Sequence, residues 1–125
     1  MKPKFYVTTP IYYVNDVPHI GHAYTSLACD VLARWKRLDG FEVFFLTGTD
    51  EHGQKVEKAA EVAGCDPQSF TDRVSLAFRD MAGAMGISND DFIRTTEPRH
   101  KLATAELWRR LQAAGDIYLG GYEGW

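Results

Sequence analysis

The sequence predicts an α/β domain with a mostly parallel sheet flanked by helices. Short apolar runs typical of strands alternate along the chain with longer segments whose apolar residues recur at helical spacing, which is typical of parallel sheets. The run at 43–46 is apolar without interruption, as expected of a strand that is covered on both faces. With 125 residues, of which 45% are hydrophobic and 25% charged, the chain has the composition of an ordinary globular protein.

The first half of the chain predicts a strand, a turn and a long helix. An apolar run indicates a strand over about 4–13, and residues 15–18 indicate a turn. A helix is expected over about 19–39, ending at Gly40. Its apolar residues follow helical spacing: Ile20, Ala23, Tyr24, Leu27, Ala28, Val31, Leu32, Trp35 and Leu38.

The second half repeats the alternation. Strands are expected at 42–49 and 91–96, and helices at about 54–63, from Asp66 onward, and at 98–114. Asp66 followed by Pro67 is typical of a helix N-cap and first turn. Core positions are expected at Trp35, Phe70, Phe78 and Met81, with Val74, Ala77 and Met85 on the same helical stripe as the last three. Residues 116–125 predict a strand or the opening of a new unit, so we expect a domain over 1–115 that is cut short.

Charge and composition exclude several classes of protein. The formal net charge is −3 and there is no basic run, so a nucleic-acid surface is not indicated within this chain. No apolar stretch reaches membrane-spanning length and the N-terminus lacks the layout of a secretory signal, so no membrane partner is expected. Cys29 and Cys65 fall on separate predicted helices without metal-type spacing, which favours free thiols in the cytoplasm.

Two histidines lie where the first predicted strand gives way to the first helix. His19 and His22 are three residues apart in the expected first helical turn, where backbone N–H groups lack helical partners and the helix dipole is positive. Such a position favours a phosphate group. Pro18 suits a first-turn position because it has no N–H, and Gly21 lets a flat ring approach the backbone closely.

A second polar cluster follows the predicted strand at 42–49. Asp50 is an acceptor suited to an ammonium group, and Ile11 with Tyr13 could line an apolar slot. Because ligands of open α/β sheets bind beyond the carboxyl ends of the strands, both clusters are expected to face one pocket. Asp50, Glu51 and His52 also admit two other interpretations, a metal site or a solvated loop.

These two segments resemble class I aminoacyl-tRNA synthetases. Residues 8–15 followed by Pro-His-Ile-Gly-His at 18–22 are similar to the first signature of that superfamily, whose His-Ile-Gly-His element binds ATP on a Rossmann-type (HUP-like) catalytic domain. The block at 47–55, Thr-Gly-Thr-Asp-Glu-His-Gly-Gln-Lys, resembles the methionyl-tRNA synthetases in particular. Residues 34–37 and 95–100 agree with that family, so the resemblance extends over the whole chain.

The resemblance implies a reaction and a role for each matching residue. A methionine–tRNA ligase activates methionine with ATP to methionyl-adenylate, releases pyrophosphate, and transfers the amino acid to the 3′-terminal adenosine of tRNA(Met). His19 and His22 would act on the α-phosphate. The resemblance assigns ATP contacts to Asn15, His19, Gly21 and His22, and methionine contacts to Pro10, Ile11, Tyr13 and Asp50. Mg²⁺ would accompany ATP.

Other family features are not found in this sequence. The Lys-Met-Ser-Lys-Ser loop, the remaining methionine pocket and the anticodon-binding domain do not occur, so the chain is expected to be the first half of the catalytic domain and inactive alone. Residues 116–125 would begin the connective insertion, and no cysteines there support zinc. Two alternatives remain: a small nucleotidyltransferase with the same histidine element, and a non-catalytic synthetase-like nucleotide-binding module.

Overall fold

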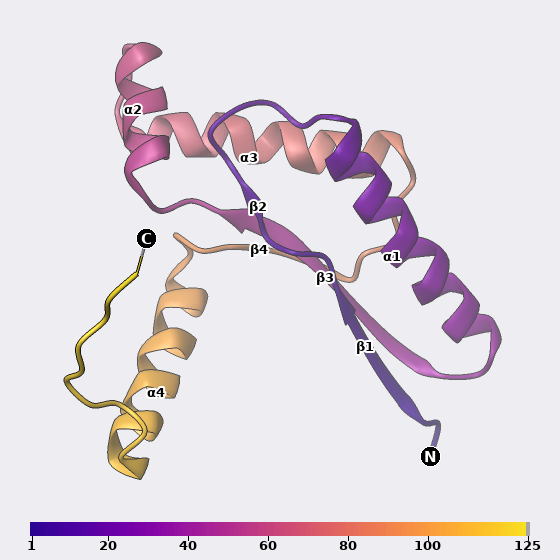
Figure 1. The fold of residues 1–125 in the computed structure, drawn as a ribbon. Helices are drawn as coiled ribbons and strands as arrows, with labels where there is room; N and C mark the ends of the chain where they lie inside the picture. Colours follow the sequence, from indigo (N-terminus) through magenta and orange to yellow (C-terminus); the bar gives the residue numbers. More distant parts are fainter. Residues whose placement is uncertain (125) are drawn as a thin grey trace. The chain divides into compact units, whose positions relative to one another are not determined.

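A parallel sheet centred on one long strand organises the first part of the molecule. The structure is a computed structural model that describes residues 1–124, and it divides into a unit spanning Met1–Thr95 and a second unit that begins at Thr96. In the first unit, β3 (Glu42–Asp50) pairs in parallel with β1 (Lys4–Thr8), β2 (Tyr12–Tyr13) and β4 (Asp91–Arg94) (Figure 1). The predicted α/β class with a parallel sheet is therefore confirmed.

The first predicted strand is interrupted. Thr8 and Tyr12 are four residues apart, whereas their partners on β3, Leu46 and Thr49, are only three apart, so one extra residue is accommodated between β1 and β2. Pro10 lies in this interval, and proline has no N–H with which to continue a ladder of hydrogen bonds. The predicted single strand over 4–13 is therefore wrong in its continuity, because a proline breaks the pairing.

The four predicted helices are all present. They are α1 (Ile20–Leu38), α2 (Gln54–Val62) and α3 (Pro67–Ala84) in the first unit, and α4 (Pro98–Ala114) in the second. Asp66 caps α3 by accepting a hydrogen bond from the Ser69 N–H at 3.0 Å, and Gly115 ends α4 with a left-handed φ of 82°. Both sequence signals therefore mark true helix ends.

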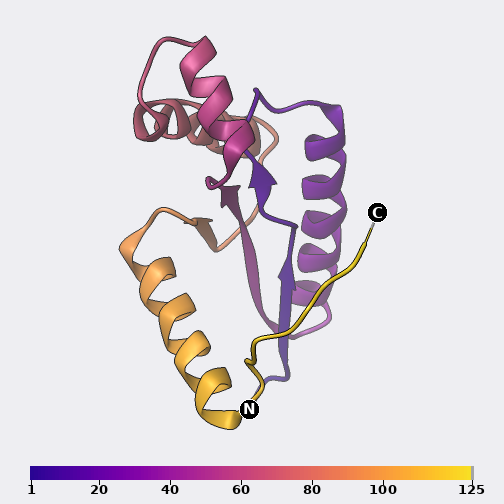
Figure 2. The same cartoon turned by 60° about the vertical axis from the view of Figure 1, so that its left-hand side comes forward.

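Helix α1 lies along the sheet beside β1 and β3 (Figure 2), but not with the face that its apolar spacing predicts. It buries Ser26, Asp30 and Ala33, whereas Trp35 is 56% exposed in the first unit. The exposed side of the helix carries Ile20, Tyr24, Leu27, Val31, Trp35 and Leu38. The prediction of Trp35 as a core residue is wrong, because hydrogen bonds of the Asp30 carboxylate turn the polar and small residues inward.

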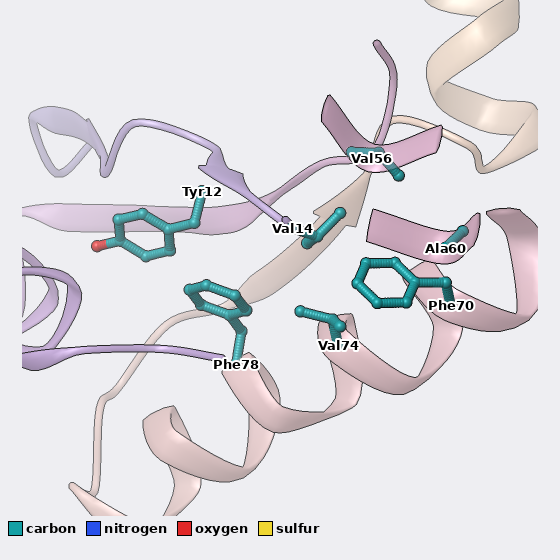
Figure 3. Close-up of a cluster of buried hydrophobic side chains, with 7 residues drawn as sticks. All are labelled: Tyr12, Val14, Val56, Ala60, Phe70, Val74 and Phe78. Carbon is teal, nitrogen blue, oxygen red and sulfur yellow. The ribbon is translucent and has the colours of Figure 1, made fainter. Parts of the chain in front are cut away.

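A cluster of buried apolar side chains joins β2 to α2 and α3. Its members, drawn in Figure 3, are Tyr12, Val14, Val56, Ala60, Phe70, Val74 and Phe78. The predicted core positions Phe70 and Phe78 belong to this cluster, and Met81 packs against it. Tyr12 and Phe78 of this cluster contact the ring of His22, so the cluster supports the start of α1.

The second unit consists of α4 and the residues that follow it. None of the residues of α4 is buried. No strand occurs between residues 116 and 124, and the last residue of the predicted segment 116–125 lies outside the described residues. The boundary expected between 115 and 116 stays a prediction. Across residues 1–124, no helix combines the length and the apolar character that a membrane crossing needs.

Candidate active site

The two histidines form a reciprocal cap at the start of α1. His19 is the N-cap residue, and its Nδ1 accepts a hydrogen bond from the Gly21 N–H at 3.1 Å. The Nδ1 of His22 accepts one from the His19 N–H, also at 3.1 Å. The pair thus satisfies two backbone donors at the helix start, as a Ser/Glu capping box does.

This arrangement decides which ring nitrogen carries the proton. A backbone N–H can only donate, so both Nδ1 atoms act as acceptors and the neutral rings hold their proton on Nε2. Partial burial, together with the neighbouring His19, lowers the pKa of His22 below its ordinary value. The two rings stack with centroids 3.8 Å apart and planes 27° apart. The start of α1 therefore presents a stacked pair of imidazoles in which each Nε2–H is a hydrogen-bond donor.

Two details of the predicted arrangement are wrong. Helix α1 begins at Ile20, so Pro18 precedes the cap and does not lie in the first turn. The Gly21 N–H is not free, because the ring of His19 folds back onto it. The His19 ring lies on the side of Gly21 toward which a Cβ would project, and a Cβ there would be 3.0 Å from the His19 Cε1 atom. Gly21 therefore permits the cap, and the donors offered to a ligand are imidazole N–H groups.

Tyr12 contacts the histidine pair from the sheet, a role that its sequence context did not predict. Its hydroxyl lies 2.8 Å from the Ser26 Oγ and donates to the His22 carbonyl oxygen at 3.2 Å. Its ring meets the His22 ring edge-on, with centroids 4.8 Å apart, and stacks on Phe78. Burial raises the pKa of this phenol, and hydrogen bonds from Ser26 and Thr9 oppose the rise. Tyr12 therefore holds the first turn of α1 against the sheet. In the sequence it is one tyrosine of an apolar run, between Ile11 and Tyr13, and nothing there marks it as a partner of His22.

Asp50 and Tyr13 lie side by side at the carboxyl end of the sheet. They are direct partners in the β2–β3 register, and the Val14 N–H donates to the Asp50 carbonyl oxygen at 3.4 Å. Gly53 follows with φ 118°, and a Cβ on it would lie 2.4 Å from the Tyr13 hydroxyl oxygen. The positive φ therefore favours glycine there, and a side chain at this position would also displace the Tyr13 hydroxyl. This part of the site brings together two of the predicted methionine contacts.

The other predicted contacts lie in the two loops that flank β2. Pro10 and Ile11 are exposed in the interval between β1 and β2. Asn15 lines an open cavity of about 510 Å³ whose walls come from residues 15–17, α2 and α3. Neither His19 nor His22 is among the described residues that line this cavity. The structure therefore groups His19, Gly21 and His22, pairs Tyr13 with Asp50, and places Asn15 on a separate hollow.

Buried polar contacts hold the segment after β3. The side chain of Glu51 is 0% exposed, and Arg94 at the end of β4 donates to both of its carboxylate oxygens, at 2.7 and 3.0 Å. Thr95 accepts from the Glu51 N–H at 2.9 Å, and its hydroxyl also lies 2.9 Å from the His52 Nδ1. Within residues 1–124, His, Cys, Asp and Glu side chains form no group of three that could hold a metal ion. The metal interpretation of residues 50–52 therefore has no support in the described residues.

The family model described as "tRNA synthetases class I (M)" matches residues 5–125. The chain belongs to this family. A methionine–tRNA ligase of Rickettsia bellii is 67% identical over 125 residues, which are 100% of this chain and 25% of that protein. The chain thus spans about a quarter of the length of the curated relatives it matches.

Solved structures of class I synthetases share the fold of this chain. Methionyl-tRNA synthetase of Mycobacterium tuberculosis, in a crystal structure bound by methionyl-adenylate, is 55% identical with a TM-score of 0.90, over 97% of this chain and 24% of that one. A LeuRS of Agrobacterium radiobacter K84, in a ternary complex with tRNA and LeuAMS, is 31% identical with a TM-score of 0.79, over 94% of this chain and 15% of that one. The fold is therefore the parallel sheet with flanking helices of the class I synthetase catalytic domain.

Proposed function

We propose that residues 1–115 are the N-terminal half of a methionine–tRNA ligase catalytic domain and that residues 116–125 begin its connective insertion. The enzyme would join methionine to ATP as methionyl-adenylate, release pyrophosphate, and transfer the methionyl group to the 3′-terminal adenosine of tRNA(Met). The observation that carries the proposal is the stacked histidine pair, whose Nδ1 atoms are both occupied by backbone donors and whose Nε2–H groups are donors for a ligand. The methionyl-adenylate bound by a relative of 55% identity supports the substrate.

The histidine pair would act when charge builds up on the α-phosphate. A carboxylate oxygen of methionine attacks the α-phosphorus, a new P–O bond forms, and the bond to the pyrophosphate oxygen breaks. Donors on His19 and His22 would stabilise the negative oxygens of this transition state, which is the way that preorganised hydrogen bonds accelerate such reactions. Because the cap holds both rings before substrate arrives, little reorganisation accompanies the reaction.

The remaining residues would bind and orient the two substrates. Asp50 would bind the methionine ammonium group, while Pro10, Ile11 and Tyr13 would contact the rest of the amino acid. Gly21 would pack against adenine, and Asn15 would reach the ATP from its loop. Mg²⁺ would enter with ATP as part of the substrate, and most contacts to tRNA would come from other parts of the enzyme.

The substrate is tested by amino-acid-dependent exchange of pyrophosphate into ATP. The full-length protein implied by the proposal should catalyse exchange with methionine and not with leucine or isoleucine. Exchange with leucine or isoleucine alone would overturn the substrate assignment, and absence of exchange with any amino acid would overturn the ligase. Residues 1–125 alone should show no exchange, because the Lys-Met-Ser-Lys-Ser loop is not among them. The unpaired cysteines, Cys29 and Cys65, agree with a cytoplasmic enzyme.

A further inference from the structure

We propose that the ion pair between Arg94 and Glu51 positions Asp50 for the ammonium group of the amino-acid substrate. Arg94 and Glu51 would be positioning residues, since they would act through Asp50 and would not touch the substrate. The inference rests on the proposed function, in which Asp50 binds that ammonium group.

Asp50 lies between two buried neighbours. Thr49 is 0% exposed and the Glu51 side chain is 0% exposed, whereas Asp50 itself is only half-buried. Successive side chains of a strand point to opposite faces, so the Asp50 carboxylate lies on the face opposite to its two neighbours. The contacts of Thr49 and Glu51 therefore hold the backbone on both sides of Asp50.

Both neighbours are held by the same set of contacts. The Thr49 hydroxyl donates to the Glu51 Oε1 at 2.8 Å, and Arg94 donates to both Glu51 oxygens. Thr95, next to Arg94, accepts from the Glu51 N–H, and its own N–H donates to the Thr49 carbonyl oxygen at 3.2 Å. Arg94 and Thr95, at the end of β4, thus bind the residue before Asp50 and the residue after it.

Arg94 keeps its positive charge through the range of pH in which enzymes work. The hydrogen bonds that Arg94 donates to the carboxylates of Glu51 and Asp72 raise its pKa above its already high ordinary value. Arg94 also lowers the pKa of Asp72, a half-exposed residue on α3 that forms its second ion pair. A planar guanidinium that holds two carboxylate oxygens cannot be replaced by an ammonium group without loss of geometry. The substitution Arg94→Lys keeps the charge and therefore isolates the geometry.

The main measurement is the affinity of the full-length enzyme for methionine. We expect Arg94→Lys to raise the Kd for methionine about tenfold and to leave the KM for ATP within about twofold, since the histidine pair lies on other elements. Arg37→Lys is the matched control. Arg37 pairs with Asp90 at 2.9 Å and donates to Ser88, and it has no contact with Asp50 among the described residues. The control should leave both constants unchanged.

A double substitution separates positioning from general support of the fold. If Arg94 acts through Asp50, then Arg94→Lys should have no further effect on methionine affinity in an Asp50→Asn enzyme. Additive losses would mean that Arg94 supports the fold only, and would overturn the inference. If Asp50→Asn weakens methionine binding while Arg94→Lys does not, the inference falls and the proposed function stands.

The proposed role of Asp50 has its own failure. If Asp50→Asn leaves methionine affinity unchanged, the ammonium assignment in the proposed function is wrong.

Should Arg94→Lys fail to fold, Glu51→Gln gives the same comparison, because the amide keeps one acceptor for Arg94 and removes the charge. We expect it to raise the methionine Kd about fivefold, again without effect in the Asp50→Asn enzyme. An unchanged Kd in Glu51→Gln would overturn the inference.

Discussion

The imidazole of His22 has two nitrogen atoms, and two substitutions can separate what each of them does. Its Nδ1 accepts the His19 N–H at 3.1 Å as part of the helix cap, whereas its Nε2–H is the donor proposed for the α-phosphate. Asparagine places an amide oxygen near the position of Nδ1 and has no group at the position of Nε2. Glutamine has one amide for both positions: in the conformation that places its N–H near the position of Nε2, its oxygen does not reach the His19 N–H and the acceptor at Nδ1 is lost. His22→Asn therefore keeps the cap, and His22→Gln keeps the donor.

The expected magnitudes follow from these two roles. Loss of one preorganised donor to a developing oxyanion slows a reaction about 10²–10³-fold. Because the ring of His19 lies only 3.8 Å away and offers a second donor, we expect the lower end of that range, about 10², for His22→Asn. Loss of a cap lowers the free energy of unfolding by about 1 kcal/mol. We expect that loss in His22→Gln, with adenylate formation slowed only about tenfold.

The assay is rapid-quench measurement of methionyl-adenylate formation by the full-length enzyme at saturating substrates, together with the Kd for ATP. The rate should fall far more than ATP affinity, because the donors act on charge that exists only in the transition state. His100→Asn, a change on α4, serves as the control. Equal rates for His22→Asn and His22→Gln would refute the division of roles. A loss of ATP affinity as large as the loss of rate would refute action in the transition state.

The remaining predictions concern the histidine pair, the packing of the sheet and the dependence of stability on pH. Gly21→Ala places a Cβ 3.0 Å from the His19 Cε1 atom, so the ring must move and adenylate formation, measured by rapid quench, should slow about tenfold. Gly48→Ala places a Cβ 2.0 Å from a main-chain oxygen of β4 and should lower the free energy of unfolding in urea by about 3 kcal/mol, whereas Gly83→Ala, in open space on α3, should raise it by about 0.5–1 kcal/mol. Because the pKa of His22 is lowered in the fold, its contribution to stability is present above about pH 6.5 and is lost as the pH falls below that value. The midpoint of thermal unfolding should therefore fall between about pH 7 and 5, and fall less in His22→Asn.

Local signals in the sequence predicted the order and type of the elements. The cap at Asp66 and the proline after it marked the start of α3, and Gly115 marked the end of α4, because both ends depend on backbone conformation within a few residues. The break between β1 and β2 also has a local cause, since Pro10 cannot donate a hydrogen bond to a sheet. The apolar run on both sides of Pro10 nevertheless favoured the prediction of one continuous strand.

The buried face of α1 could not be predicted from spacing alone. Its apolar stripe is real, yet Asp30 is buried because the N–H and hydroxyl of Ser88, at 2.7 and 2.5 Å, and the Arg34 side chain satisfy its carboxylate. Ser88 lies in the loop before β4 and Arg34 lies one turn along α1. The spacing of apolar residues in the helix carries no information about either contact. A buried charge is tolerated when its hydrogen bonds are complete, and that condition depends on tertiary contacts.

The difference between local sequence signals and tertiary contacts also separates the predicted from the unpredicted residues of the site. His19, His22 and Asp50 could be found because each is polar and lies at or beyond the carboxyl end of a strand, where parallel sheets bind ligands. The supporting residues Tyr12 and Arg94 gave no such signal, since one lies within an apolar run and the other ends a short strand 43 residues after its partner Glu51. Their roles depend on which side chains meet across the sheet.

The spacing of the histidine pair satisfies two requirements at once. A reciprocal cap needs its two side chains at the N-cap and N3 positions, three residues apart. Serine and glutamate also satisfy that geometry, but once bonded to the backbone neither offers a neutral N–H donor to a phosphate. Imidazole has an acceptor for the cap at Nδ1 and a donor at Nε2, on opposite sides of a rigid ring. Formation of the helix start thus sets the tautomer and the stacking of the rings, and a variant that keeps the cap while losing the donor should fold normally and react slowly.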